Sequence, residues 1–357
     1  MRRLGTAELL TIGCFATLLS AQQNFDTVQV RAQHVAGSVW MLQGAGGNIG
    51  VAVGRDGIFL VDDEFAPLTV KITAAIAAID SAPIRFLLNT HWHGDHTGGN
   101  ENLGKAGVLI LAQDNVRKRM STDQFIAAFD SHVPASPLGA LPVVTFSDTV
   151  TFWLNDDTTI AFHVPPAHTD GDAIIYWRHA NVVHMGDTFF NGRYPLIDLS
   201  SGGSVDGMIG AADRVLALAN ADTKIIPGHG PLADRASLRA YRDMLVAVRD
   251  KIRGAYHARV IARNQTAERA GPDLAEAIGD VDVEQLRRAD AIEDLHAEAR
   301  LPALVQLRRQ GLAGRDAHAQ RRELTVVLHH LVDHGRHRRQ NRGPVAGAEL
   351  KELLRRG

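Results

Sequence analysis

The sequence predicts an α/β fold in which helices pack on a mixed β-sheet. Short apolar segments separated by glycine-rich turns fill residues 28–63, and helical patterns alternate with further apolar strands over residues 68–252. Strands first, followed by alternation with helices, are typical of a sheet covered by helices. With 357 residues, 45% of them hydrophobic, the chain has enough apolar material for such a core.

Each strand is predicted from a short apolar or alternating segment bounded by turn-forming residues. The predicted strands are 28–35, 38–43, 49–53, 58–61, 84–88, 108–111, 143–146, 150–154, 159–164, 173–177, 182–185 and 224–226. Helices are predicted where apolar residues recur every three or four positions. The predicted helices of this region are 68–79, 205–218 and 235–252.

Residues 1–21 are typical of a secretory signal peptide. Arg2 and Arg3 precede an apolar stretch that ends in small residues and is shorter than the roughly 20 residues that span a bilayer. We therefore expect a periplasmic or secreted protein with no stable membrane anchor after signal removal; a frayed N-terminal helix is the alternative. The single cysteine, Cys14, lies inside this stretch, which excludes an internal disulfide framework.

Residues 254–357 differ in composition from residues 25–253, the predicted catalytic domain. Beyond Tyr256 there is no Phe or Trp and no further Tyr, and Ala, Arg and His dominate. Because aromatic side chains carry much of a core's buried area, we expect a weakly packed helical tail, with short helices at 283–295, 303–309 and 323–332. A shifted reading frame in a GC-rich gene would give the same composition, and a metal-handling or interaction segment is a further alternative.

The charge balance limits the class of partner. Lys and Arg number 38 against 40 for Asp and Glu, a net charge of −2. A general nucleic-acid-binding protein would carry a marked basic excess, so we expect a small-molecule substrate and no nucleic acid. The oligomeric state is left open. The 17 histidines are the unusual part of the composition and are either metal ligands or a compositional accident.

A dense group of potential metal ligands follows the predicted strand 84–88. His91, His93, Asp95 and His96 lie within six consecutive residues. Imidazole nitrogens together with a carboxylate suit Zn²⁺. Alternation along the loop sends His91 and His93 to one side, which leaves Asp95 and His96 to serve a second ion.

Three later residues have matching chemistry at the ends of predicted strands. His168 follows two prolines, Asp187 follows a glycine, and His229 lies between two glycines. These breaks end each strand and expose the side chain, and glycine allows close backbone approach. Each could be structural by itself, but together they reinforce the interpretation as a metal site.

The motif His-x-His-x-Asp-His, followed in order by His168, Asp187 and His229, resembles the metallo-β-lactamase superfamily over residues 28–252. The resemblance implies a four-layer αβ/βα sandwich with the metal site at one edge of its two sheets. It implies two zinc ions per chain, and it assigns their ligands. One ion would be held by His91, His93 and His168, the other by Asp95, His96 and His229, with Asp187 bridging.

The same resemblance implies roles around the ions. Asp63 would support the metal-binding loop and orient ligand imidazoles, with Asp62 as the alternative. Two zinc ions sharing a hydroxide would lower the pKa of water toward about 7, and the hydroxide would attack a carbonyl carbon. Asp95 and Asp187 are the predicted catalytic residues. Asp95 would steer the nucleophile and pass a proton to the leaving group, while Asp187 stands where one β-lactamase class has a thiolate.

Substrate contacts are predicted from the loops around the site, chiefly residues 188–204 and the turn 44–48. The candidate side chains are Trp92, Phe190, Asn191, Arg193 and Tyr194. A guanidinium pairs bidentately with a carboxylate, so Arg193 is the candidate for holding a charged substrate. Phe190 occupies the position of the lysine that holds the drug's carboxylate in thiolate-type β-lactamases, and core packing is the alternative for it.

The leading hypothesis is an exported binuclear zinc hydrolase acting on a cyclic amide or ester. Quorum-signal lactonases and glyoxalase II share the ligand set, so a lactonase or a thioesterase is the alternative. The tail lacks the aromatic residues of the glutathione-binding domain of glyoxalase II. An iron-binding redox protein, or a non-catalytic metal-binding protein on the same fold, is the remaining alternative.

Overall fold

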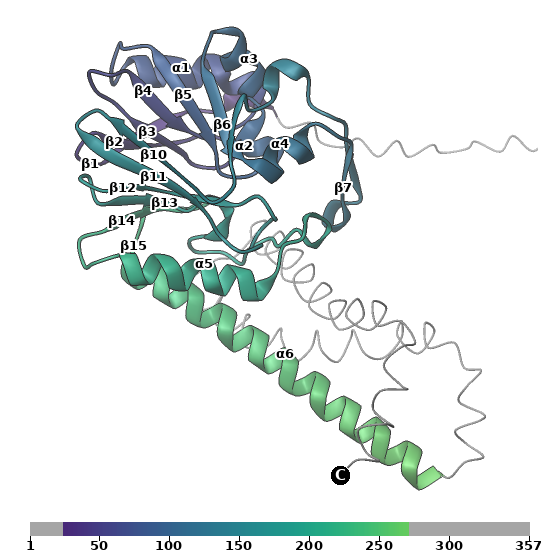
Figure 1. Cartoon of the computed structure of the whole chain (residues 1–357). Coiled ribbons are helices and arrows are strands. Elements are labelled where there is room, and N and C mark those ends of the chain that lie inside the picture. Colours follow the sequence, from purple (N-terminus) through teal and green to yellow (C-terminus); the bar gives the residue numbers. More distant parts are fainter. Residues whose placement is uncertain (1–23, 271–357) are drawn as a thin grey trace, which may run out of the picture.

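Two β-sheets stacked face to face form the centre of the molecule, as the computed structural model shows (Figure 1). The structure describes residues 24–270, with side chains to residue 258. The predicted signal peptide and the three predicted tail helices lie outside the described residues. Within residues 24–270 no helix combines the length and apolar character needed to cross a membrane.

The first sheet has seven strands in the order β1-β2-β3-β4-β5-β6-β9. They are β1 (Arg31–Ala36), β2 (Val39–Gln43), β3 (Ile49–Ala52), β4 (Ile58–Val61), β5 (Ile84–Asn89), β6 (Leu109–Gln113) and β9 (Val144–Phe146). Strands β1 to β4 are antiparallel neighbours, and β4, β5, β6 and β9 run parallel. The sheet is therefore mixed, as the sequence predicts.

The second sheet has six strands in sequence order. They are β10 (Thr149–Leu154), β11 (Asp157–His163), β12 (Ala173–Trp177), β13 (Val182–His184), β14 (Lys224–Ile226) and β15 (Ala233–Asp234). Only β13 and β14 run parallel. A separate hairpin is formed by β7 (Gln124–Ile126) and β8 (Ser131–Val133).

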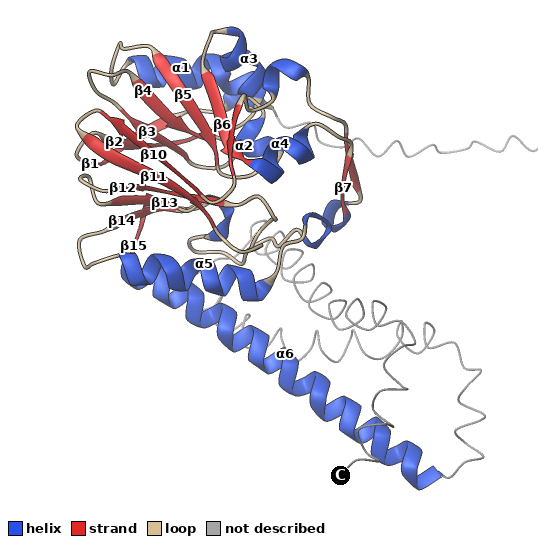
Figure 2. Cartoon of the chain, in the orientation of Figure 1, coloured by secondary structure: helices blue, strands red, loops and turns tan. Residues whose placement is uncertain are grey.

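Helices cover the outer faces of the two sheets, and short helices also lie beside the strand ends at one edge of the sandwich (Figure 2). They are α1 (Thr69–Ala77), α2 (Gly94–Thr97), α3 (Asn100–Lys105), α4 (Asp114–Met120), α5 (Val205–Leu218) and α6 (Arg235–Ala270). Helix α6 extends beyond the predicted end at residue 252 because no proline interrupts the sequence before residue 272. The predicted boundary at residue 253 therefore falls inside this helix.

Three apolar layers hold the sandwich together. Ile72 and Ile76 of α1 pack on the outer face of the first sheet, and Met208 of α5 packs on the outer face of the second. Between the sheets, Phe59 and Trp177 are buried in a shared cluster. These contacts give the four-layer αβ/βα order that the family resemblance implies.

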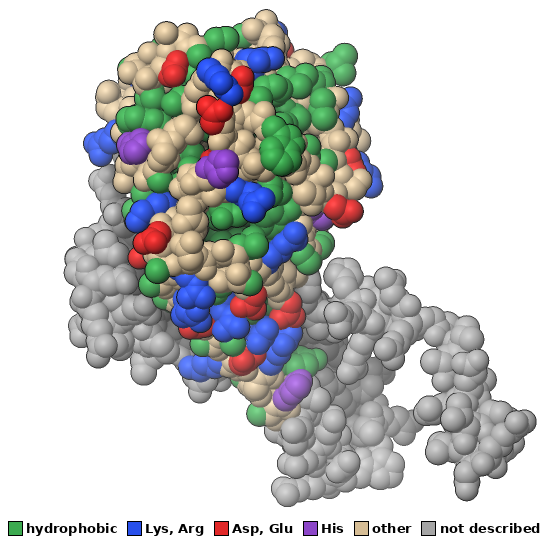
Figure 3. Space-filling view, turned by 60° about the vertical axis from the view of Figure 1, so that its left-hand side comes forward, with side chains coloured by type: hydrophobic (Ala, Val, Ile, Leu, Met, Phe, Trp, Pro, Cys, Tyr) green, Lys and Arg blue, Asp and Glu red, His purple; other side chains and the backbone are tan. Residues whose placement is uncertain are grey.

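Charged side chains of both signs are interspersed on the surface. Figure 3 shows Lys and Arg beside Asp and Glu on one face, without a continuous patch of either sign. Arg242 pairs with Asp213 at 2.8 Å, and Arg249 pairs with Asp206 at 3.0 Å, both between α5 and α6. This distribution fits the near-zero net charge and places no basic surface on this face.

We expect Asp157→Ala to lower the free energy of unfolding by about 1–3 kcal/mol. The buried Asp157 carboxylate accepts backbone N–H groups from Thr158, His179 and Ala180 at 2.6, 2.7 and 3.0 Å, and so closes the β12–β13 turn onto β11. Urea unfolding measures the loss. Asp222→Ala, at an exposed position, is the control and should stay within about 0.5 kcal/mol of wild type; equal stability of the two variants would contradict this role.

Candidate metal centre

Four loops meet at one edge of the sandwich, each following the carboxyl end of a strand. The loop after β5 carries His91, His93, Asp95 and His96, and the loop after β11 carries His168. The loops after β13 and β14 carry Asp187 and His229 respectively. Carboxyl ends of strands are the usual place for sites in open α/β sheets. All seven predicted ligands lie together here.

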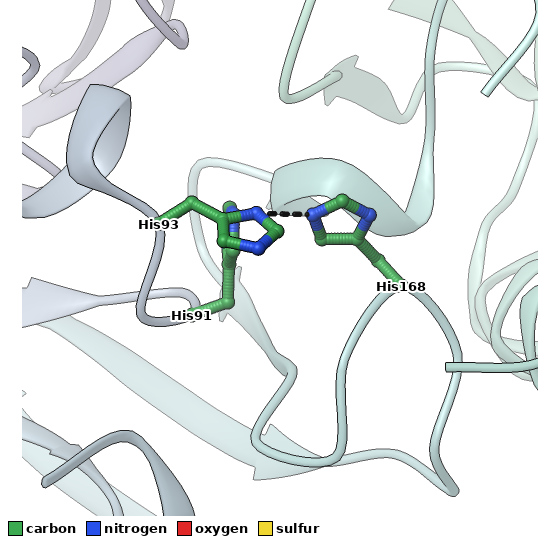
Figure 4. A group of neighbouring side chains, drawn as sticks. All are labelled: His91, His93 and His168. Carbon is green, nitrogen blue, oxygen red and sulfur yellow. Dashed lines mark hydrogen bonds between the residues drawn. The ribbon is translucent and has the colours of Figure 1, made fainter. Parts of the chain in front are cut away.

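The first group is His91, His93 and His168, whose candidate ligand atoms all lie within 4.8 Å of one another. Figure 4 shows His91 and His93 on one loop with His168 facing them from the other sheet. His93 Nδ1 lies 2.8 Å from His168 Nε2. The three imidazoles are buried, so this group is closed to solvent on most sides.

The outer nitrogens of these two imidazoles are already bonded. His93 Nε2 lies 3.1 Å from an Asp198 oxygen, and His168 Nδ1 lies 2.9 Å from the Leu196 carbonyl oxygen. Both partners accept hydrogen bonds, so each outer nitrogen carries the proton. In the neutral imidazoles the facing nitrogens of His93 and His168 are both lone pairs, so their 2.8 Å contact is favourable only with a proton or a metal ion between them.

The second group is Asp95, His96 and His229. His229 Nε2 lies 3.3 Å from Asp95 Oδ2 and 3.4 Å from His96 Nε2. The outer nitrogen of His96, Nδ1, lies 2.8 Å from Asp62 Oδ2, so it too carries the proton. Burial opposes charge on His96, but Asp187, Asp95 and Asp62 raise its pKa, so Nε2 also carries a proton, which a metal ion would displace.

Asp187 lies between the two groups. Its carboxylate oxygens are 3.5 Å from His168 Nε2, 3.1 Å from His96 Nε2 and 3.4 Å from His229 Nε2. Gly228 makes this approach possible, because a Cβ there would lie 2.0 Å from Asp187 Oδ1. One carboxylate therefore reaches ligands of both groups, which is the geometry of a bridge.

The polar atoms of this centre fit metal ions. His91 Nε2 is buried and has no hydrogen-bond partner among the described residues. Its other nitrogen lies 3.0 Å from Thr90 Oγ1, whose own proton goes to Asp62 at 2.7 Å. An unpaired buried nitrogen costs free energy, and a metal ion would compensate that cost. Nitrogen and carboxylate donors in two groups of three suit Zn²⁺.

The pKa values of ligand histidines shift in opposite directions in the two ligand groups. Burial lowers the pKa of His91, and it lowers the pKa of His168 to about 4. Both stay neutral at pH 7, the form that binds metal. Burial opposes charge on His229 as well, but Asp187 and Asp95 raise its pKa to about 9. The carboxylates thus create a site that attracts a positive charge.

The structure corrects the predicted role of Asp63. Asp62, the alternative, contacts the His96 imidazole and also accepts the Thr90 backbone N–H at 2.7 Å. Asp63 instead accepts the backbone N–H of Gly99 at 3.0 Å and touches no ligand imidazole. Both carboxylates are buried, but neighbouring positions on a strand end point in different directions. Asp62 therefore orients the ligand, and Asp63 holds the loop backbone.

The structure also corrects the predicted role of Trp92 as a substrate wall. Its side chain is only 3% exposed and packs with Val116 and Met120. Its indole N–H donates to Ser201 Oγ at 3.1 Å. Trp92 lies between two ligands that face the centre, so alternation along the loop turns it toward the core.

The four other residues predicted to contact a substrate lie in different environments. Phe190 is buried and stacks on the His229 imidazole, with ring centres 5.3 Å apart. The Asn191 side chain donates to the Pro231 carbonyl oxygen at 2.9 Å. Arg193 is exposed and Tyr194 is partly buried. Phe190 and Asn191 therefore support the His229 loop, and the substrate roles of Arg193 and Tyr194 stay predictions.

The sequence alone does not identify two carboxylates, Asp198 and Asp172, that hold ligand histidines in place. Asp198 bonds His93 and also accepts the hydroxyls of Ser200 and Ser201. Asp172 accepts the backbone N–H of His168 at 2.6 Å and the Thr169 hydroxyl at 2.6 Å. The pattern Thr169-Asp170-Gly171-Asp172 hints at such a turn, but nothing in the sequence places Asp198 beside a residue 105 positions earlier.

We expect Asp198→Ala to weaken zinc binding at the His91, His93 and His168 group by about 10- to 100-fold. The substitution removes the acceptor that fixes the orientation and tautomer of His93. Competition with a chromogenic chelator measures the affinity. Asp148→Ala, at an exposed position, is the control, and the role fails if both variants bind zinc as wild type does.

Sequence comparisons identify relatives of this chain. Hydroxyacylglutathione hydrolase of Nitrosococcus oceani is 30% identical over 168 residues, which cover 46% of this chain and 55% of that protein. The enzyme of the same name from Brucella anthropi is 32% identical over 139 residues, covering 37% and 46%. The chain thus spans about half the length of the curated relatives it matches.

One solved structure shows the fold of this chain, and one family pattern shows its family. A metallo-beta-lactamase from Pontibacter korlensis superposes with a TM-score of 0.51 at 18% identity, over 61% of this chain and 99% of that one, which describes the fold alone. The sequence pattern of the metallo-beta-lactamase superfamily matches residues 42–249, more than half of the chain. The chain therefore belongs to the metallo-beta-lactamase superfamily, with the His and Asp groups of a metallo-hydrolase.

Proposed function

We propose that this protein is an exported hydrolase that uses two zinc ions to cleave a cyclic amide or ester. The observation that carries the proposal is that the Asp187 carboxylate lies 3.5 Å from His168 of one three-ligand group and 3.4 Å from His229 of the other. When bound, the ions would polarise a carbonyl and lower the pKa of water toward about 7. His91, His93 and His168 would hold one ion, and Asp95, His96 and His229 the other.

The exposed fractions of the ligand side chains indicate the side from which a substrate approaches the centre. The side chains of Asp95 and His229 are 29% and 17% exposed, whereas that of Asp187 is 5% exposed. Catalytic metal sites keep one position open. We infer that substrate reaches the centre over Asp95 and His229, and that the His91, His93 and His168 group lies deeper.

Asp95 is the residue of this chain that is best placed for proton transfer. Although burial opposes ionisation, the neighbouring His96 and a hydrogen bond from His229 lower the pKa of Asp95 to about 2. Its carboxylate is therefore charged at pH 7, and it is the most exposed of the ligands.

The loop that follows Asp187 supplies the substrate wall in this proposal. Arg193 is exposed and Tyr194 is partly buried on this loop, beside the stacked Phe190. A guanidinium can hold a substrate carboxylate with two hydrogen bonds. The signal-like residues 1–21 support export, and the small-molecule substrate is supported by the buried, compact centre.

A thioester is the second candidate substrate. The curated relatives named above are hydroxyacylglutathione hydrolases, whose name describes acyl-glutathione substrates. The chain covers only about half of the length of these relatives. The match therefore supports attack on the same kind of carbonyl group more than it supports binding of the same thiol.

We expect the purified full-length protein to carry about two zinc ions per chain, and the His91→Ala, His93→Ala double variant to lose the ion of the His91, His93 and His168 group. The substitutions remove two of the three nitrogens of one group and one neighbour of Asp187. Elemental analysis measures the metal content. His132→Ala, an exposed histidine away from the centre, should retain wild-type content; equal content in all three proteins would refute the assignment.

We expect hydrolysis of at least one member of a panel containing nitrocefin, an acyl lactone and an acyl thioester, abolished by chelation and restored by zinc. For a substrate with a free carboxylate, Arg193→Ala should raise KM by about 10-fold with little change in kcat, because it removes a binding contact of about 1.4 kcal/mol. Steady-state kinetics separates the two constants. Hydrolysis that survives complete metal removal would rule out the proposal.

A further inference from the structure

The segment Gly44–Asn48, here called the glycine loop, joins β2 to β3 and contacts both sides of the second ligand group. The backbone N–H of Gly47 donates to the Asp95 carbonyl oxygen at 3.1 Å. On the other side, the backbone N–H of Asn48 donates to the Gly228 carbonyl oxygen at 2.7 Å. The loop therefore spans from the α2 ligands of the first sheet to the His229 loop of the second.

The side chain of Asn48 strengthens the contact with the second sheet. Its amide nitrogen donates to the carbonyl oxygens of Pro227 and Gly230, at 2.8 and 2.9 Å. These residues flank His229 at a distance of one or two positions. The position of the His229 backbone thus depends on where the glycine loop lies.

Gly47 packs directly on the ring of His96. A Cβ at residue 47 would lie 2.0 Å from His96 Cε1, a distance that no side chain can occupy. Only glycine fits this approach. The loop backbone is therefore the surface that supports one face of the His96 imidazole.

Glu64 holds the glycine loop in place from below. Its Oε2 accepts the backbone N–H groups of Ala45 and Gly46 at 2.9 and 3.1 Å. The side chain is fully buried, and its other oxygen has no hydrogen-bond partner among the described residues. The backbone of Glu64 has φ of 55°, in the left-handed region that favours glycine.

Both features of Glu64 are unfavourable by themselves. A buried carboxylate with one unpaired oxygen costs free energy, and a left-handed non-glycine residue is strained. Glycine would satisfy the backbone at this position without either cost. A glutamate here is therefore explained by what its carboxylate holds, which is the glycine loop.

We propose that Glu64 is a positioning residue that clamps the glycine loop against α2 and the His229 loop, and thereby sets the spacing of Asp95, His96 and His229. The inference rests on the proposed two-metal site and assigns Glu64 to one ion of the pair. The other group has separate supports: Asp198 bonds His93, and the Leu196 carbonyl bonds His168. Loss of the clamp therefore affects the two ions unequally.

Stepwise zinc binding to the full-length Glu64→Gly variant tests this assignment. Glycine relieves the left-handed backbone, so a purely structural effect predicts unchanged or higher stability and unchanged metal binding. The clamp instead predicts that the first zinc equivalent binds as in wild type and that the affinity for the second falls about 10- to 100-fold. Calorimetric titration of the metal-free protein with zinc resolves the two steps, and thermal unfolding with one equivalent bound reports the fold.

Three further variants sharpen the result. Glu64→Gln keeps an amide oxygen for Ala45 and Gly46, and it should recover most of the second affinity. Glu101→Gln, a partly exposed glutamate that pairs with Lys105, should bind both equivalents as wild type does. Gly47→Ala pushes the loop off His96 by another route and should lose the second step as Glu64→Gly does, which keeps the test decisive if Glu64→Gly does not fold.

The outcomes separate this inference from the proposed function. Two wild-type steps that persist unchanged in Glu64→Gly, or in Gly47→Ala where Glu64→Gly is unfolded, overturn the clamp and leave the two-metal site intact. A single step in the wild-type protein overturns the two-metal site and the clamp together. Equal weakening of both steps in Glu64→Gly also overturns the clamp, because it assigns Glu64 to the whole centre.

Discussion

The centre depends on one constraint: the outer nitrogen of each buried ligand imidazole is held by an oxygen acceptor. Thr90, Asp198, Asp62 and the Leu196 carbonyl fill this role for four of the five ligand histidines. Each bond fixes a tautomer and turns a lone pair inward. Nitrogens that converge in a buried space need protons or metal ions between them, so the oxygen atoms that hold the outer nitrogens largely determine what the centre can bind.

The sandwich makes that arrangement possible because it brings strand ends from two sheets to one edge. The first sheet contributes the loop after β5, and the second contributes the loops after β11, β13 and β14. The supports come from elsewhere in the chain. Asp198 lies beyond Asp187, while Asp62 and Glu64 follow β4. Asp198 supports the first ligand group and Glu64 contacts the loop beside the second, whereas Asp62 serves both groups, through Thr90 and through His96.

The sequence predicts the parts of this structure that depend on local pattern. Strand β12 and helix α5 have the predicted bounds because their apolar patterns are long and are bounded by turn residues. Helices α2, α3 and α4 have at most seven residues, too few to show a helical period, and the sequence does not predict them. The sequence identifies four ligands because they lie within six residues after a strand, and the other three because they stand at strand ends near glycines or prolines.

The errors have a common physical origin. Asp63 and Trp92 each lie next to a residue with the opposite orientation, and a sequence pattern does not show which neighbour faces the centre when the strand has just ended. Glu64 and Asp198 contact residues that are distant in sequence, so no spacing rule identifies them. Supporting residues emerge only when loops from different strands are placed side by side.

Anomalous diffraction at the zinc edge, on crystals of the zinc-loaded full-length protein, tests the central claim most directly. A two-metal centre requires two peaks, one about 2.0–2.1 Å from ligand nitrogens of His91, His93 and His168 and one at the same distance from nitrogens of His96 and His229. Asp187 should lie between the peaks. A single peak, or peaks away from these residues, would contradict it.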